Sequence, residues 1–144
     1  MSDTFTRVTL LGQMDGAEVF EFVDGDLVDD DLRQLFTMSL FTWRRALPDD
    51  DVPEGVSRQG WWADPEFGSR LWLLNYRKVD ASAVADARLY TAEALDWMVD
   101  EQIVERIDVT TERDPSGRGV LMSLEASRPL QPDARIRYAY LWAH

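Results

Sequence analysis

Residues 58–74 read Arg-Gln-Gly-Trp-Trp-Ala-Asp-Pro-Glu-Phe-Gly-Ser-Arg-Leu-Trp-Leu-Leu, and the rest of the chain is most simply organised around this stretch. We call it the Trp-rich segment. It contains three of the six tryptophans and two arginines, begins with turn-forming residues and ends in an apolar run typical of a helix. Tryptophan and arginine are the residues most enriched where one protein surface docks on another. Either Trp61 and Trp62 fill the core, or the segment anchors the fold and also faces a partner; we expect at least one of these tryptophans to be buried, with the flanking arginines reaching outward.

The composition is that of an ordinary globular protein. The 144 residues are 45% hydrophobic and 29% charged, which predicts a single domain over residues 1–144 with its own core. The absence of cysteine excludes disulfides, thiolate metal sites and cysteine nucleophiles. No apolar run approaches the roughly 18 residues of a membrane span, and the first residues lack the pattern of a secretory signal. We therefore expect no membrane contact and a cytosolic protein.

The charge distribution suggests what kind of partner the chain binds. A net charge of −12, from 27 acidic and 15 basic residues, argues against nucleic-acid binding. Several arginines nevertheless gather in the middle third of the chain. They either meet carboxylates on a protein partner or pair internally with the runs of aspartate. The candidate partner-binding residues are Arg44, Arg45, Arg58, Trp61, Trp62 and Arg70.

The first part of the chain predicts a β-hairpin followed by a helix. Residues 6–11 and 17–23 have strand patterns around a Gly-containing turn, and a further turn at residues 24–25 precedes a short returning strand at 26–28. Aspartates at 29–31 then mark a helix start. Apolar residues recur every three or four positions to about residue 45, which places Arg44 and Arg45 in the last helical turn, where cations are favoured.

The remaining pattern gives two more helices and three strands. Ser69 is a credible N-cap for a short helix over residues 70–78, and Asp80 for a long helix over about 81–102. Residues 107–112, 120–126 and 135–142 alternate between apolar and polar and are separated by turns, which predicts an antiparallel meander. The expected fold is α+β, with an N-terminal β-hairpin, two long helices with a short helix between them, and a C-terminal three-stranded antiparallel meander.

Few residues suit catalysis. The only histidine, His144, is the last residue, which argues against a Ser-His-Asp triad or a histidine metal site. The glycines do not form a phosphate-binding loop, and the aspartate runs lack the spacing of a calcium loop. Glu18, Asp64 and Glu66 are the carboxylates considered for glycoside hydrolysis, but 27 acidic residues give close pairs by chance. We expect no catalytic residue, no cofactor and no metal.

Five short motifs carry a family resemblance: Asp-Gly-Asp-Leu at 24–27, Ser-Leu-Phe-Thr at 39–42, Arg-Arg-Ala at 44–46, Gly-Trp-Trp-Ala-Asp at 60–64 and Gly-Ser-Arg-Leu-Trp-Leu-Leu at 68–74. In this order and spacing, over about residues 20–100, they resemble the Mu-like bacteriophage baseplate protein family. Pro-Glu-Phe-Gly-Ser at 65–69 also resembles a signature of the sheath-initiator (lysozyme-like) wedge proteins of contractile machines. The chain departs from that wider pattern at Trp43, where an acidic residue is expected, and at Gln59, where a second arginine is expected. The Glu-Pro-Arg motif of that wider group is also not clearly present in this chain.

The resemblance implies a structural component of a contractile phage tail baseplate, joining the wedge to the first sheath ring. Its partners would be other baseplate wedge proteins and the tail sheath subunit, in multiple copies around the tail axis. Its location would be the virion, after assembly in the host bacterial cytoplasm. Strand addition at the C-terminal sheet would supply part of the contact, with residues 120–126 and 135–142 as the platform; otherwise these strands only cover the helices. The alternatives are a peptidoglycan-degrading lysozyme-like enzyme of the tail and a stand-alone binding module.

Overall fold

The computed structural model describes residues 7–14, 17–23 and 30–143, and the α+β class and the order of elements are as the sequence predicts. The expected turn at 24–25, the strand at 26–28 and His144 lie outside the described residues. The elements are β1 (Arg7–Met14), β2 (Ala17–Val23), α1 (Asp30–Phe41), the 3-10 helix η1 (Leu71–Tyr76), α2 (Ala81–Asp100), β3 (Arg106–Arg113), β4 (Gly119–Ser127) and β5 (Ala134–Leu141).

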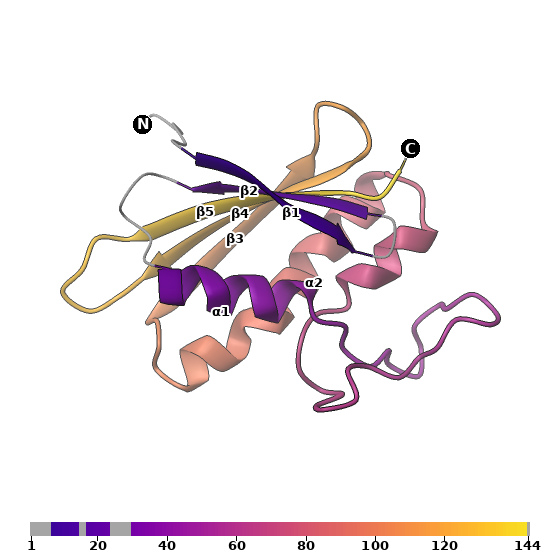
Figure 1. Cartoon of the computed structure of the whole chain (residues 1–144), viewed down its shortest axis with the longest axis horizontal. Helices are drawn as coiled ribbons and strands as arrows, with labels where there is room; N and C mark the ends of the chain where they lie inside the picture. The colour runs from indigo at the N-terminus through magenta and orange to yellow at the C-terminus, as the bar shows by residue number, and fades with distance from the viewer. Residues whose placement is uncertain (1–6, 15–16, 24–29, 144) are drawn as a thin grey trace.

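The five strands form one antiparallel sheet in the order β1-β2-β5-β4-β3 (Figure 1). The C-terminal meander is confirmed, and the N-terminal hairpin extends it because β2 pairs with β5. The expected platform for strand addition is wrong in its choice of strands. β4 and β5 each pair on both sides, so their backbone groups are already used; the free edges of the described sheet are β1 and β3.

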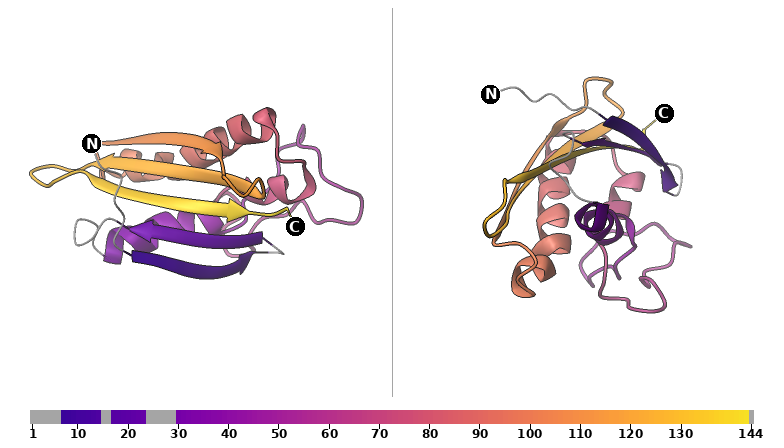
Figure 2. Two further views of the ribbon diagram at one scale, coloured as in Figure 1. Left: turned by 90° about the horizontal axis from the view of Figure 1, so that it is seen from above. Right: turned by 60° about the vertical axis from the view of Figure 1, so that its left-hand side comes forward.

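Both long helices pack on one face of this sheet (Figure 2). The apolar positions of β4 and β5 point to that face and are buried, with Met122, Tyr138 and Tyr140 among the largest fully buried side chains. α2 begins as expected, since the Asp80 carboxylate accepts a hydrogen bond from the Ala83 amide at 2.8 Å. Removal of this apolar surface from water is the main force holding the helices on the sheet.

A buried ion pair joins the hairpin to α1. Glu21 of β2 points inward and is 1% exposed, and its carboxylate accepts from the Arg33 guanidinium. Nearby, the Tyr138 and Thr37 hydroxyls are 3.1 Å apart, and burial raises the pKa of Tyr138. A carboxylate in the core is tolerated because it is paired.

α1 ends at Phe41, not at residue 45 as the apolar period predicts. Residues 43–46 are not helical, because the amides of Arg44, Arg45 and Ala46 bond to the Trp-rich segment instead. Arg44 and Arg45 are therefore not in a helical turn. The short helix is also shorter than expected: η1 covers Leu71–Tyr76, with Arg70 at its N-cap position. Ser69 lies one residue earlier, where its hydroxyl accepts from the Leu71 amide at 3.2 Å.

Candidate functional site

The Trp-rich segment folds around the extended chain that follows α1. The Arg44 amide donates to the Ser69 carbonyl at 3.0 Å, and the Arg45 amide to the Pro65 carbonyl at 2.8 Å. The Ala46 amide donates to the Arg58 carbonyl, also at 3.0 Å. One short stretch of chain thus binds three separated points of the segment, which fixes the path of a long connection without a regular helix or sheet.

Two glycines allow this close approach. A Cβ atom on Gly60 would come closer than 3.0 Å to the Arg45 amide and the Pro65 carbonyl. Gly68 has φ +104°, a left-handed conformation that other residues rarely adopt, and its Cβ would collide with the Thr42 carbonyl. Close packing of the backbone therefore explains why glycine occupies both positions in the motifs at 60–64 and 68–74.

Trp72 and Trp43 fill the core beneath the segment. Trp72 is 2% exposed, and its ring stacks on that of Trp43 with centroids 4.7 Å apart and planes 7° apart. The Trp72 indole nitrogen donates to the Arg44 carbonyl at 2.9 Å. The tryptophan core is therefore formed by Trp43 and Trp72, where Trp61 or Trp62 was expected.

Neither Trp61 nor Trp62 is a core residue, so the expectation that one of them is buried is wrong. Trp61 is 41% exposed and Trp62 is 88% exposed. Their rings meet edge-on at 6.4 Å, and Trp61 meets Phe67 at 6.3 Å. Phe67 in turn lies 6.1 Å from Trp97 of α2. An aromatic row thus runs from the helix layer out to Trp62, which presents most of its indole to solvent.

Arg70 lies in the interior of a charge cluster. Its guanidinium binds both carboxylate oxygens of Glu93 at 2.9 and 3.1 Å and Asp50 at 2.8 Å, and it stacks over Tyr90 at 4.7 Å. Burial alone would lower the pKa of Arg70, but the hydrogen bonds to Glu93 and Asp50 raise it above its ordinary value. The side chain is only 12% exposed, and its bonds to Asp50 and Glu93 link the loop at 47–57 to α2. For Arg70, internal pairing with an aspartate run was the correct alternative.

The other three arginines divide between interior and surface. Arg44 donates to the Glu66 carbonyl at 2.8 Å and pairs with Glu93 at 3.1 Å. Arg58 turns back on its own loop, where its guanidinium donates to the Leu47 carbonyl. Arg45 is 54% exposed and meets only the exposed carboxylate of Glu66, at 3.6 Å. The expectation that the flanking arginines reach outward is wrong for Arg58 and Arg70.

A shallow groove adjoins this segment. It has a volume of about 430 Å³ and is lined by both apolar and charged residues. The lining residues are Arg45, Ala46, Leu47, Pro48, Arg58, Gln59 and Glu66. Leu47 is 47% exposed there, so the surface beside the tryptophans has further apolar area available for contact.

The carboxylates considered for hydrolysis are not arranged as a facing pair. Asp64 and Glu66 share one exposed turn, in which Asp64 accepts from the Glu66 amide at 3.1 Å. Glu18 lies on β2 and pairs with Arg118. In the part of the chain that the structure describes, no three His, Asp or Glu side chains group as a metal site, and no helix is long and apolar enough to cross a membrane.

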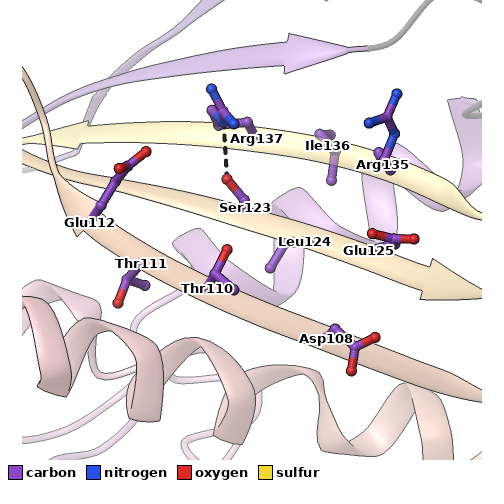
Figure 3. Close-up of a pocket in the computed structure, with 10 residues that line it drawn as sticks. All are labelled: Asp108, Thr110, Thr111, Glu112, Ser123, Leu124, Glu125, Arg135, Ile136 and Arg137. Atoms are coloured by element: carbon purple, nitrogen blue, oxygen red, sulfur yellow. Dashed lines mark hydrogen bonds between the residues drawn. The ribbon is translucent and has the colours of Figure 1, made fainter. Parts of the chain in front are cut away.

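The sheet face without helices holds a second depression, of about 380 Å³, over β3, β4 and β5 (Figure 3). Acidic, basic and hydroxyl side chains alternate across it, and Arg137 donates to the Ser123 hydroxyl at 3.0 Å. These charges of mixed sign do not converge on one point. The exposed tip of the Trp-rich segment, residues 61–66, therefore remains the stronger candidate for a contact surface.

Comparison with known proteins gives the family. A family model described as phage protein GP46 matches residues 32–133, which include the whole Trp-rich segment. Baseplate protein gp46 of Escherichia phage Mu is 44% identical over 92 residues, covering 60% of this chain and 63% of that protein. Mu-like prophage FluMu protein gp46 of Haemophilus influenzae is 35% identical over 88 residues, covering 58% of each chain. The chain thus spans about six tenths of the length of these relatives, and no solved structure gives a significant match. The chain belongs to the phage protein GP46 family, a Mu-like phage baseplate family.

Proposed function

We propose that the chain is a non-enzymatic structural component of a phage tail baseplate and docks on a neighbouring baseplate wedge protein through the tip of its Trp-rich segment. The observation that carries this proposal is Trp62, which is 88% exposed on a segment fixed at its base. The relative in phage Mu is named a baseplate protein, which supports the same role here. The chain would occur in multiple copies around the tail axis of the virion, after assembly in the host cytoplasm.

The physical case rests on area and rigidity. An aromatic side chain covered on binding removes about 150–250 Å² from water. Five backbone hydrogen bonds between residues 42–46 and the segment, one of them from the Trp61 amide to the Trp43 carbonyl, already hold the segment in place together with the aromatic row. Little conformational entropy is therefore lost when a partner covers the tip. Buried tryptophans at the centre of an interface commonly contribute 2 kcal/mol or more, about a 30-fold change in affinity.

The six candidate residues then take two roles. Trp61, Trp62 and Arg45 face the partner, because they are the exposed members. The remaining members position that surface from behind: they are Arg44, Arg58 and Arg70. Their guanidinium groups bind carbonyls and carboxylates of the chain itself.

Trp62→Ala tests the docking role. The variant should fold as the wild type does, because it removes no buried contact, and it should be lost from purified tails. Leu130→Ala is the control, since Leu130 is an exposed apolar residue in the turn between β4 and β5, outside the segment. Equal numbers of wild-type and Trp62→Ala chains in tails, counted by quantitative mass spectrometry, would contradict the proposal.

We further propose that β3 accepts an added strand from the tail sheath, so that the chain joins the wedge to the first ring of a contractile tail. The Asp114 amide donates to the Gly119 carbonyl at 2.9 Å, which fixes the alternation of the ladder. Even-numbered residues of β3 therefore bond to β4, and the backbone groups of Ile107 and Val109 point out of the sheet. The Arg88 side chain, at 3.2 Å, occupies the Val109 carbonyl and would have to be displaced.

Ile107→Pro tests this edge. It removes an outward amide and leaves the β4 ladder intact, so the protein should fold while sheath attachment fails. Asp108→Pro is the comparison, because it removes a ladder hydrogen bond and should destabilise the sheet itself. Sheathed tails of normal length in electron micrographs of the Ile107→Pro phage would rule out strand addition at β3.

A further inference from the structure

Resting on the docking role proposed above, we infer that the partner surface that receives Trp62 is basic: an apolar recess bordered by arginine or lysine side chains. The arginine content of the sequence suggested the opposite, a partner rich in carboxylates. The charges that remain available at the surface decide between the two.

Three of the four candidate arginines do not present their positive charge at the tip. The guanidinium of Arg70 is only 12% exposed among Asp50 and Glu93, and that of Arg58 donates to carbonyls of its own loop. Arg44, 23% exposed, is held by Glu93 and by the Glu66 carbonyl. These three charges are turned toward the protein, so they contribute little to a contact made at the tip.

Negative charge, by contrast, faces outward beside the tryptophans. Asp64 and Glu66 follow Trp62 within four residues, and both are exposed, with the Glu66 side chain at 72%. Arg45 is the one arginine of the six candidates with most of its side chain exposed, and its charge is already matched by Glu66. The indole of Trp62 thus stands next to at least one uncompensated carboxylate.

The surrounding loop adds to this field. Residues 47–66 contain six acidic residues, of which only Asp50 pairs with Arg70, and a single arginine, within a chain of net charge −12. The face of an indole ring is itself negative and attracts cations, Arg more often than Lys. Carboxylates beside an exposed tryptophan therefore favour a partner whose recess is bordered by cationic side chains.

The same charges argue against a second copy of this chain as the occupant. Two copies that met through their tips would bring acidic loops together, and like charges across an interface destabilise it. A carboxylate-rich partner would meet the same repulsion. A basic partner is drawn in from a distance and loses that attraction as salt screens it.

Charge-neutralising variants test the sign of the partner surface. In Asp64→Asn with Glu66→Gln, each amide keeps the shape of the acid, and the new Asn oxygen can still accept from the amide of residue 66. The control is Glu125→Gln with Asp133→Asn, which changes the net charge equally at exposed carboxylates of β4 and of the turn before β5. Phage tails are assembled in which each double variant or, separately, Trp62→Ala replaces the wild-type chain. The copies retained are counted after washes from about 0.1 to 1 M NaCl, a range over which the Debye length falls from about 10 to 3 Å.

We expect the Asp64→Asn/Glu66→Gln chain to be retained up to about tenfold less than wild type at low salt and the control to be retained normally. Wild-type retention should fall as NaCl rises. If Trp62→Ala is lost while the tip double variant binds as well as wild type or better, the basic partner is refuted and the docking role survives. If Trp62→Ala is retained, the docking role itself fails. Equal losses in the two double variants would mean that overall charge, not the tip, matters, and would also refute the inference.

Cross-linking of wild-type tails gives an independent readout. A carbodiimide joins carboxylates directly to lysine amines in contact with them. Links from Asp64 or Glu66 to lysines of another tail protein support the basic partner. The chain has a single lysine, Lys78; links from the tip to Lys78 of a second copy would assign the surface to self-association instead.

Discussion

Arg70→Ala should destabilise the fold far more than the loss of Arg45 or Arg58. The variant removes a two-point ion pair to Glu93, a second pair to Asp50 and a stacking contact with Tyr90. Breaking a fully buried pair costs about 3–5 kcal/mol because the remaining charge is left without a partner. Glu93 is 30% exposed and keeps its ion pair with Arg44, so water and Arg44 replace part of what it loses, and the pairs then account for about 2–3 kcal/mol. The stacking contact adds about 0.5–1 kcal/mol, for a total near 3 kcal/mol.

Urea unfolding measures this loss. With a slope of about 2 kcal/mol per molar urea, 3 kcal/mol lowers the midpoint by about 1.5 M. Arg45→Ala is the matched control: its one ion pair, at 3.6 Å between exposed groups, should be worth less than about 0.5 kcal/mol. Arg70→Lys should fall between the two, because an ammonium group cannot reproduce the two-point geometry. Midpoints for Arg70→Ala and Arg45→Ala that agree within error would refute the account of this cluster.

Three further predictions concern the backbone and the core. Gly68→Ala should lose about 2–4 kcal/mol, because alanine must adopt φ +104° with its Cβ against the Thr42 carbonyl; chemical denaturation checks it, and a loss below about 1 kcal/mol would contradict the packing. Trp72→Ala should lower the free energy of unfolding by about 3–5 kcal/mol and Trp62→Ala by less than about 0.5 kcal/mol, because only Trp72 is buried. Thermal unfolding measures both variants, and equal losses would contradict the assigned burial. The backbone hydrogen bond from the α2 N-terminus lowers the pKa of Asp80, so its carboxylate stabilises the fold above about pH 4 and that contribution is lost as the pH falls through the lowered value. The stability gap between wild type and Asp80→Ala should therefore narrow from pH 7 to pH 3; a constant gap would contradict it.

Local patterns were sufficient for the elements that depend on local physics. The alternation in β4 and β5 placed Met122 and Tyr138 on the buried face, because a strand with one covered face needs that period. Asp80 marked the start of α2 because its carboxylate satisfies a free amide of the first turn. Neither inference required a contact distant in the sequence.

The end of α1 could not be predicted in this way. Its apolar period continues past Phe41, but Pro65 and Ser69 take the amides of Arg45 and Arg44. Those acceptors lie 20 or more residues further along the chain, and no local signal reveals them.

The tryptophans and arginines of the segment were ambiguous for a related reason. Composition shows that a tryptophan core is available but not which rings form it, and the stacking of Trp43 on Trp72 leaves Trp61 and Trp62 outside. Arg70 likewise depends on Glu93, which lies on another element. Gly60 and Gly68 are more informative than the tryptophans and arginines about how the segment folds, because both glycines fix how closely two chain segments approach.

The most direct test of the docking claim is a cryo-EM map of the assembled tail in which the indole of Trp62 can be located. We expect another baseplate protein to cover this side chain, which is 88% exposed in the free chain, while α1, α2 and the sheet keep their present arrangement. A map in which Trp62 faces solvent, or in which the chain lies outside the baseplate, would contradict it.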